Sequence, residues 1–216
     1  MKKIVILGTG GHARMVATLI HDMAAHGHEV SIAGYSVPVG ELDQRRDPIG
    51  GKVLGEDTIL PELARNGTAT HFAIGRGSVL GGETDRPRLF DLAVAAGLEP
   101  ASVWHHTATV FPTATLGGGA VLMAGSIVCA DVVLGPNVIV NTNSSVDHDG
   151  KIGAHTHISA GVTLAGTVTV GSNCFIGVGS TISHSIVIGD DVTVGAGAMV
   201  IRDVESGRIV KGVPAK

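Results

Sequence analysis

The stretch "VGSNCFIGVGSTISHSIVIGDDVTV", residues 170–194, decides the fold of the C-terminal half of this 216-residue chain. Every sixth residue in it is Val or Ile, and the same spacing of Val, Leu or Ile continues over sixteen positions from Val110 to Val200. The residue after the aliphatic one is often glycine, and the residue four after it is small or aliphatic. This period predicts short flat strands with two inward-pointing residues per six, joined by corners at or near the glycine.

The first hundred residues follow a different pattern, in which strands and helices alternate. Short apolar runs at 2–8, 29–35 and 70–75 predict strands, and the spacing of apolar residues predicts helices over 12–27 and 84–100. Alternation with short connections favours a small parallel sheet with helices on its faces. We therefore predict an N-terminal domain over 1–103 and a repeat domain with a C-terminal tail over 104–216.

The composition excludes several classes of function. Charged residues make up 16% of the chain and the formal net charge is −4, without the basic patch that a nucleic-acid backbone requires. No apolar stretch is long enough to span a bilayer, and the first apolar run is too short for a signal peptide. Two cysteines suggest no disulfide framework. We expect a cytoplasmic protein that binds neither nucleic acid nor membranes.

The repeat resembles that of the hexapeptide-repeat acyltransferases, whose left-handed parallel β-helix uses three hexapeptides, or 18 residues, per triangular coil. The motifs "WHHTATV" (104–110), "IVNTNSSVDHDGKIG" (139–153), "HTHISAGVTLAGTVTVG" (155–171) and "GVPAK" (212–216) resemble those of the bacterial sugar acyltransferases. These enzymes pair the β-helix with a small nucleotide-binding domain. The resemblance implies an α/β N-terminal nucleotide-binding domain with a small parallel sheet, followed by a left-handed parallel β-helix.

One charged group, Asp147-His148-Asp149, interrupts the apolar repeat. Residues 18 apart would lie above one another in successive coils, so His148 should lie next to Gly166, which leaves room and an accessible backbone amide. A base beside an amide donor is what acyl transfer needs, because one group removes a proton and the other stabilises the developing oxyanion. The alternative is that the group forms an ordinary solvated corner.

The family resemblance implies a role for each candidate site residue. His148 would be the general base on the sugar amine or hydroxyl, and Asp149 would hold its ring. Because His148 and His157 are half a coil apart, they would meet only across a subunit boundary, which implies a homotrimer with three interfacial sites. The remaining candidates are Asn141 for the substrate, His157 for the acetyl group, the Gly166 amide for the thioester carbonyl, and Lys211 and Lys216 for the phosphates of acetyl-CoA.

The loop "LGTGGHA" (7–13) follows the first predicted strand and opens the first helix. Its glycine spacing places backbone amides at a helix N-terminus, where phosphate binds. NAD also requires an acidic residue at the end of the second strand, where this chain has Gly34-Tyr35-Ser36. The resemblance implies that the loop binds the pyrophosphate of a nucleotide-sugar through Gly10, Gly11 and His12; the nucleotide stays open. The stretch "AIGRGS" (73–78) supplies a further loop at a strand end.

Together with the residue pattern, the resemblance implies an acetyl-CoA-dependent N-acetyltransferase that acts by direct transfer on a nucleotide-linked amino-deoxysugar, expected to be a 4-amino sugar, in surface glycan biosynthesis. We expect no metal in its reaction. Alternatives are an O-acetyltransferase of a sialic-acid-like sugar and a non-catalytic nucleotide-sugar-binding scaffold. A zinc-dependent hydratase is disfavoured, because His148 and His184 would lie two coils, or about 10 Å, apart and could not share one ion.

Overall fold

The computed structural model describes residues 1–42, 49–78 and 85–216. The chain forms two compact units by its internal contacts. The first comprises Met1–Gly77 and Asp85–His106, and the second contains Thr107–Lys216. Within the described residues, no helix has the length and apolar character needed to cross a bilayer.

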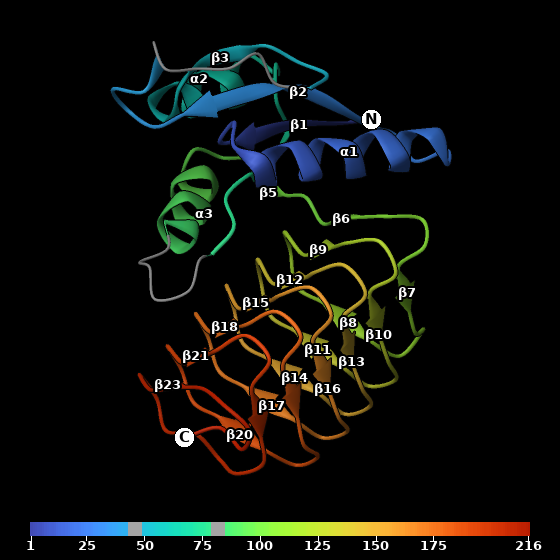
Figure 1. Ribbon diagram of the computed structural model, residues 1–216. Coiled ribbons are helices and arrows are strands. Elements are labelled where there is room, and N and C mark those ends of the chain that lie inside the picture. Colours follow the sequence, from blue (N-terminus) through green and yellow to red (C-terminus); the bar gives the residue numbers. More distant parts are fainter. Residues whose placement is uncertain (43–48, 79–84) are drawn as a thin grey trace. The chain divides into compact units, whose positions relative to one another are not determined.

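The first unit is built on a five-stranded parallel sheet of order β3-β2-β1-β4-β5 (Figure 1). The small parallel sheet predicted from the sequence is confirmed, although β3 and α2 were not predicted because both are too short for a clear periodicity. The elements are β1 (Lys2–Leu7), α1 (Gly11–Ala25), β2 (Val30–Val37), β3 (Val53–Glu56), η2 (Asp57–Ile59), α2 (Leu60–Arg65), β4 (His71–Ile74), α3 (Arg86–Ala95), β5 (Glu99–Pro100) and β6 (Val103–Trp104).

The two faces of this sheet carry different helices. Val5 and Leu7 of β1 belong to one buried cluster with Leu63 of α2 and Leu89 of α3. Ile6 points the other way, because successive residues of a strand alternate between faces. A Cβ added to Gly75 would lie 2.8 Å from both Ile6 Cγ2 and Ala13 Cβ, so this face packs against the start of α1. The carboxyl ends of β1 and β4 are therefore held close to the N-terminus of α1.

The second unit is a β-helix of two-residue strands arranged in three parallel sheets (Figure 1). Paired strands lie 18 residues apart, as in Ile127↔Ser145 and Val128↔Val146, except in the last coil, where Thr193 pairs with Ile209. The first sheet contains β7 (Thr109–Val110), β10 (Ile127–Val128), β13 (Ser145–Val146), β16 (Thr163–Leu164), β19 (Thr181–Ile182) and β22 (Met199–Val200). The second contains β8 (Thr115–Leu116), β11 (Val133–Leu134), β14 (Lys151–Ile152), β17 (Thr169–Val170) and β20 (Val187–Ile188). The third contains β9 (Val121–Leu122), β12 (Ile139–Val140), β15 (His157–Ile158), β18 (Phe175–Ile176), β21 (Thr193–Val194) and β23 (Ile209–Val210).

The six-residue aliphatic ladder forms the core of this β-helix. Every member from Leu122 to Val200 is buried, and only Val110 and Leu116, in the first coil, are not. The two-residue strands bring each aliphatic side chain inward at the same point of each face, so the ladder becomes three columns of touching side chains. The predicted parallel β-helix is confirmed.

The left-handed corners lie near the glycine that follows the aliphatic residue, but not at it. Every sixth residue from Gly119 to Gly197 has a positive φ, which places the left-handed corner three residues after the aliphatic one. Asn143 (φ 54°) and Asp149 (φ 60°) occupy such corners, in agreement with the tolerance of Asn and Asp for this conformation. The sequence predicted corners at or near the glycine that follows the aliphatic residue, and the structure has them two residues beyond it.

Those glycines meet a steric requirement instead. A Cβ on Gly117 would lie 2.4 Å from the carbonyl carbon of Gly135, and a Cβ on Gly153 would lie 2.4 Å from that of Gly171. Both positions stack directly on the backbone of the next coil, where no side-chain atom fits. The glycine after the aliphatic residue thus lets successive coils approach to the normal strand spacing.

Gly153→Ala is expected to destabilise the protein by about 1–3 kcal/mol, because the added methyl overlaps backbone atoms that cannot move independently. Urea unfolding followed by circular dichroism measures the change. Gly179→Asn is the control, since nothing lies within 4 Å of a Cβ there and Asn occupies the equivalent corner at residue 173. The control should stay within about 0.5 kcal/mol of the wild type. Equal stability of Gly153→Ala and the wild type would contradict the steric explanation.

Candidate active site and nucleotide pocket

His148 lies in the turn that follows β13, with its ring against the next coil. A Cβ added to Gly166 would lie 2.5 Å from His148 Nε2 and 2.7 Å from Cε1, so the stacking predicted from the 18-residue spacing is confirmed. In the part of the chain that the structure describes, the Gly166 N–H donates no hydrogen bond. The corner therefore presents an imidazole nitrogen and a backbone donor side by side.

Two carboxylates hold His148 in this position. Asp149 Oδ2 lies 2.8 Å from His148 Nδ1, and Asp147 Oδ1 accepts the backbone N–H of His148 at 2.7 Å. Successive residues of a strand point to opposite faces, but Asp149 sits at a left-handed corner, which turns its carboxylate toward the ring. When Nδ1–H donates to Asp149, the lone pair is on Nε2, the ring atom nearest Gly166.

The same carboxylates raise the pKa of His148. The hydrogen bond to Asp149 is the largest cause, followed by the negative charge of Asp147. A base must be neutral to accept a proton, so activity is expected to fall as the pH drops through this raised pKa.

Asp149→Asn should move the acid limb of the kcat/KM–pH profile to lower pH, because it removes the charged partner that raises the pKa of His148. Steady-state rates between pH 5 and pH 9 measure the shift. Asp190→Asn is the control, since it makes the same change from carboxylate to amide at another corner. An acid limb that stays in place, or moves to higher pH, would contradict the assignment of the limb to His148.

Asn141 and His157 lie together, away from the His148 corner. Asn141 Nδ2 is 3.3 Å from His157 Nε2, and the buried His157 ring meets the ring of Phe175 edge-on at 5.4 Å between centroids. His157 belongs to β15, whereas His148 follows β13, so the two histidines extend from different sheets of one chain. The sequence did not predict the contact of Asn141 with His157, because the two residues are 16 apart and belong to different columns.

Lys211 stacks on the column that contains Asn141. Each step of this column is a ladder contact, from Asn141 through Ser159, Gly177 and Gly195. A Cβ on Gly195 would lie 3.0 Å from Lys211 Cβ. The backbone groups of Lys211 and Lys216 exchange two hydrogen bonds of 3.1 Å, which folds the tail back on itself. Lys211 and Asn141 therefore lie on one side of the β-helix.

A cavity of about 390 Å³ opens at the carboxyl end of the sheet in the first unit. Helix α1 begins there, with Gly10 at its N-cap and no side chain capping its first turn. The first N–H groups of a helix have no partner within the helix, so they offer donors to an anion. The lining residues are Gly8, Thr9, Gly10, Gly11, His12, Pro38, Glu41, Gly75, Arg76 and Gly77. The predicted phosphate candidates Gly10, Gly11 and His12 thus share one cavity.

Arginines give this cavity a positive environment that the sequence alone did not reveal. Arg76 lines it from the loop after β4, and the buried Arg86 donates from Nη1 to the carbonyl oxygen of Arg76 at 2.8 Å. Burial, and then the charge of Arg86, lower the pKa of His12 to about 4, so His12 is a neutral hydrogen-bonding group at physiological pH. The cavity is suited to a phosphate or diphosphate ligand.

The second strand ends later than the sequence suggested. Gly34-Tyr35-Ser36 lie inside β2, which continues to Val37, so their assignment to the strand end was wrong. The first acidic residue after β2 is Glu41, which lines the cavity and lies 3.9 Å from Arg76 Nη2. An acidic residue after the second strand is therefore present.

A family model described as the hexapeptide repeat of succinyl-transferase matches residues 167–202. Perosamine N-acetyltransferase from Caulobacter crescentus, solved with CoA and GDP-perosamine, is 33% identical, with all of this chain and 96% of that chain covered and a TM-score of 0.86. The acetyltransferase domain of PglB from Neisseria gonorrhoeae, solved with acetyl coenzyme A, is 32% identical, with 100% and 98% covered and a TM-score of 0.85. A comparison with curated protein sequences gave no match.

These similarities define the class of the protein. The chain belongs to the hexapeptide-repeat acyltransferases. Within that family it is a sugar N-acetyltransferase that uses acetyl-CoA.

Proposed function

We propose that the protein transfers the acetyl group of acetyl-CoA directly to the amino group of a nucleotide-linked amino-deoxysugar, with His148 as general base. The observation that carries this proposal is the contact of His148 Nε2 with the Gly166 position, together with a Gly166 N–H that donates to no described group. A base and an oxyanion donor at one point are the two groups that acyl transfer requires.

The reaction follows from these two groups. His148 Nε2 takes a proton from the sugar amine as the amine nitrogen attacks the thioester carbonyl carbon. The Gly166 N–H donates to the oxygen that becomes negatively charged. When the tetrahedral intermediate collapses, the carbon–sulfur bond breaks and the imidazolium returns its proton to the leaving thiolate. The products are the N-acetyl sugar and free CoA, and no covalent enzyme intermediate is formed.

The first unit would hold the nucleotide. We place the diphosphate at the N-terminus of α1, against Gly10, Gly11 and His12. Arg76 would supply positive charge to the phosphates, and Glu41 would accept a hydrogen bond from the nucleobase. The Caulobacter crescentus relative was solved with GDP-perosamine, so a GDP-linked 4-amino sugar is the first substrate to test.

A panel of UDP-, GDP- and dTDP-linked 4-amino sugars, each paired with its 4-hydroxy analogue, tests the substrate proposal. Release of free thiol from acetyl-CoA is followed for every acceptor. We expect rapid release with one amino sugar and slow release with its hydroxy analogue. Faster release with the hydroxy analogue would show an O-acetyltransferase, and binding without thiol release would show a scaffold; both results would contradict the proposal.

The assembly that we propose is a homotrimer with active sites between subunits, in the cytoplasm. The side chain of His148 is 58% exposed, so a single chain leaves the reacting atoms open to water. Asn141, His157 and Lys211 lie on another side of the same chain, where they would serve acetyl-CoA bound at a neighbour's His148. Light scattering after size exclusion measures the assembly, and an active monomer would contradict it.

Arg76→Ala is expected to raise the KM for the nucleotide-sugar by about 10–100-fold, the value of a charge-assisted hydrogen bond. The KM for acetyl-CoA should stay unchanged, because the cavity near Arg76 belongs to the first unit alone. Steady-state kinetics with each substrate varied in turn measures both. Arg65→Ala is the control, since Arg65 is at the end of α2 and outside the cavity lining. A rise in the KM for acetyl-CoA alone would contradict this assignment.

A further inference from the structure

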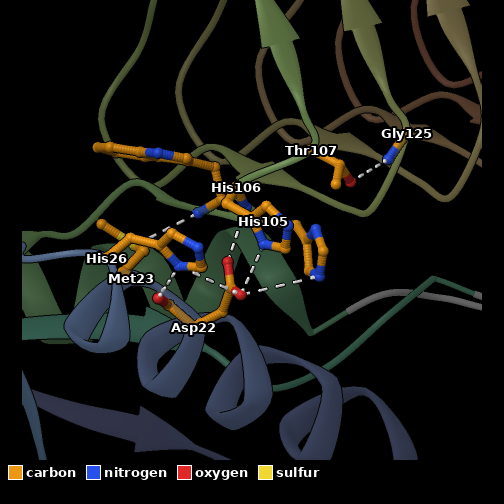
Figure 2. A network of polar contacts seen from close by, with 8 residues as sticks. Asp22, Met23, His26, His105, His106, Thr107 and Gly125 are labelled. Atoms are coloured by element: carbon orange, nitrogen blue, oxygen red, sulfur yellow. Dashed lines mark hydrogen bonds and ion pairs between the residues drawn. The ribbon is translucent and has the colours of Figure 1, made fainter.

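A cluster of histidines around one carboxylate lies in the first unit, outside the proposed reaction (Figure 2). Asp22 and His26 are one turn apart near the end of α1, and His105 and His106 directly follow β6. His106 Nδ1 lies 2.8 Å, His26 Nδ1 3.6 Å and His105 Nε2 3.9 Å from the same oxygen, Asp22 Oδ1. Three imidazoles thus converge on one carboxylate oxygen.

The distances between the potential ligand atoms of this cluster are close to those between the ligand atoms of a metal site. Tetrahedral zinc with bonds of about 2.0–2.2 Å places its ligand atoms about 3.3 Å from one another. Potential ligand atoms of Asp22, His26 and His106 all lie within 4.8 Å of one another. The side chains of His26 and His106 are 48% and 44% exposed, so small rotations would bring them to bonding distance.

The backbone around the cluster is already fixed. The N–H of His106 donates to Asp22 Oδ2 at 2.7 Å, which orients the carboxylate and leaves Oδ1 toward the imidazoles. The N–H of Trp104 donates to Met23 Sδ at 3.4 Å, which ties β6 to α1 just before the two histidines. Such outer hydrogen bonds are what orient metal ligands in established sites.

Imidazole nitrogens with a single carboxylate suit Zn²⁺ and related transition metals, whereas Mg²⁺ and Ca²⁺ require mostly oxygen ligands.

We propose that Asp22, His26 and His106 bind one divalent transition-metal ion, with Zn²⁺ as the best match, and that His105 or a water completes the coordination. The ion joins the end of α1 to the segment after β6. It takes no part in acetyl transfer, because no residue of the His148 corner belongs to the cluster.

The test uses full-length protein without an affinity tag, dialysed against a chelator and titrated with Zn²⁺ by calorimetry. One Zn²⁺ per chain is expected, with a higher midpoint of thermal unfolding. His26→Gln, His106→Gln and Asp22→Asn should each weaken binding by at least about 10-fold, since even the loss of an outer partner costs that much. His21→Gln, an exposed histidine of the same helix outside the cluster, is the control and should bind like the wild type. Mg²⁺ should produce no heat.

Co²⁺ gives a second readout on the wild-type protein that needs no variant. Trp104 is the single tryptophan of the chain and lies two residues before His106, so Co²⁺ in this site should quench its fluorescence. The visible spectrum should show four-coordinate cobalt without a thiolate band. Unchanged Zn²⁺ binding in the His26→Gln/His106→Gln double variant, a thiolate band from Cys129 or Cys174, or no binding at all would overturn the proposal.

Discussion

His148→Ala is expected to lower kcat by about 10²–10⁴-fold at neutral pH, the contribution of a positioned general base. The physical reason is the loss of the imidazole that Asp147 and Asp149 hold against Gly166. Binding of acetyl-CoA and of the nucleotide-sugar should change little. The imidazole accepts its proton only during the chemical step, and the proposed phosphate site lies in the other unit. Thiol release measures kcat, and calorimetry measures binding of each substrate.

His184→Ala is the matched control for this variant. His184 stands in the column of His148, two coils further along, and is also exposed, but it has no carboxylate at hydrogen-bonding distance among the described residues. It should retain kcat close to that of the wild type. A His148→Ala enzyme with near-normal kcat would show that proton removal is left to water or to another group, and it would remove the basis of the proposed mechanism.

Gly166→Ala should lower kcat by about 10²-fold with almost no loss of stability. The added methyl would lie 2.5 Å from His148 Nε2, so the ring must move by about an ångström or more, and misplacement of that size costs this factor in rate. The ring is the end of an exposed side chain and can rotate away, so the fold is not strained. Kinetics and urea unfolding on the same sample separate the two effects.

Gly153→Ala provides the contrast, because it is the same substitution made where the new methyl meets backbone. Stability should fall in Gly153→Ala and rate should fall in Gly166→Ala. If Gly166→Ala unfolds as easily as Gly153→Ala, Gly166 serves the packing of the coils, and its position beside His148 is no evidence for a catalytic role. If its rate is normal, the ring position does not limit the reaction.

The repeat made most of the second unit predictable. A strict six-residue spacing fixes which side chains point inward, and a constant 18-residue coil fixes which residues stack, so the contact of His148 with Gly166 followed from counting. The first sheet was predictable because β1, β2 and β4 are apolar runs bounded by turn residues. Both predictions depend on periodicity, which a single sequence displays directly.

Features that depend on backbone geometry or distant contacts were not predictable. The exact corner residue, two positions beyond the glycine, could not be specified from the sequence, because glycine after the aliphatic residue serves packing and not conformation. The hydrogen bond of Asn141 with His157 crosses between columns. The cluster of Asp22 with His106 joins residues 84 apart, which no local pattern connects. Arg76 belongs to the loop 73–78 that the sequence placed at a strand end, but that Arg76 lines one cavity with the start of α1 was visible only in the structure.

Because the coils stack in register, distances along one column of the β-helix are multiples of the strand spacing. Asn141 and Lys211 stand in one column, four ladder steps or about 19 Å apart, so the span between the proposed acetyl end and the proposed phosphate end is a whole number of coils. Removing one 18-residue coil that leaves Gly166 in place, such as residues 172–189, would shorten that span by one step and preserve the strand register of the coils on either side. Selection can therefore adjust the reach of such an enzyme toward its donor only in increments of about 4.8 Å, never continuously.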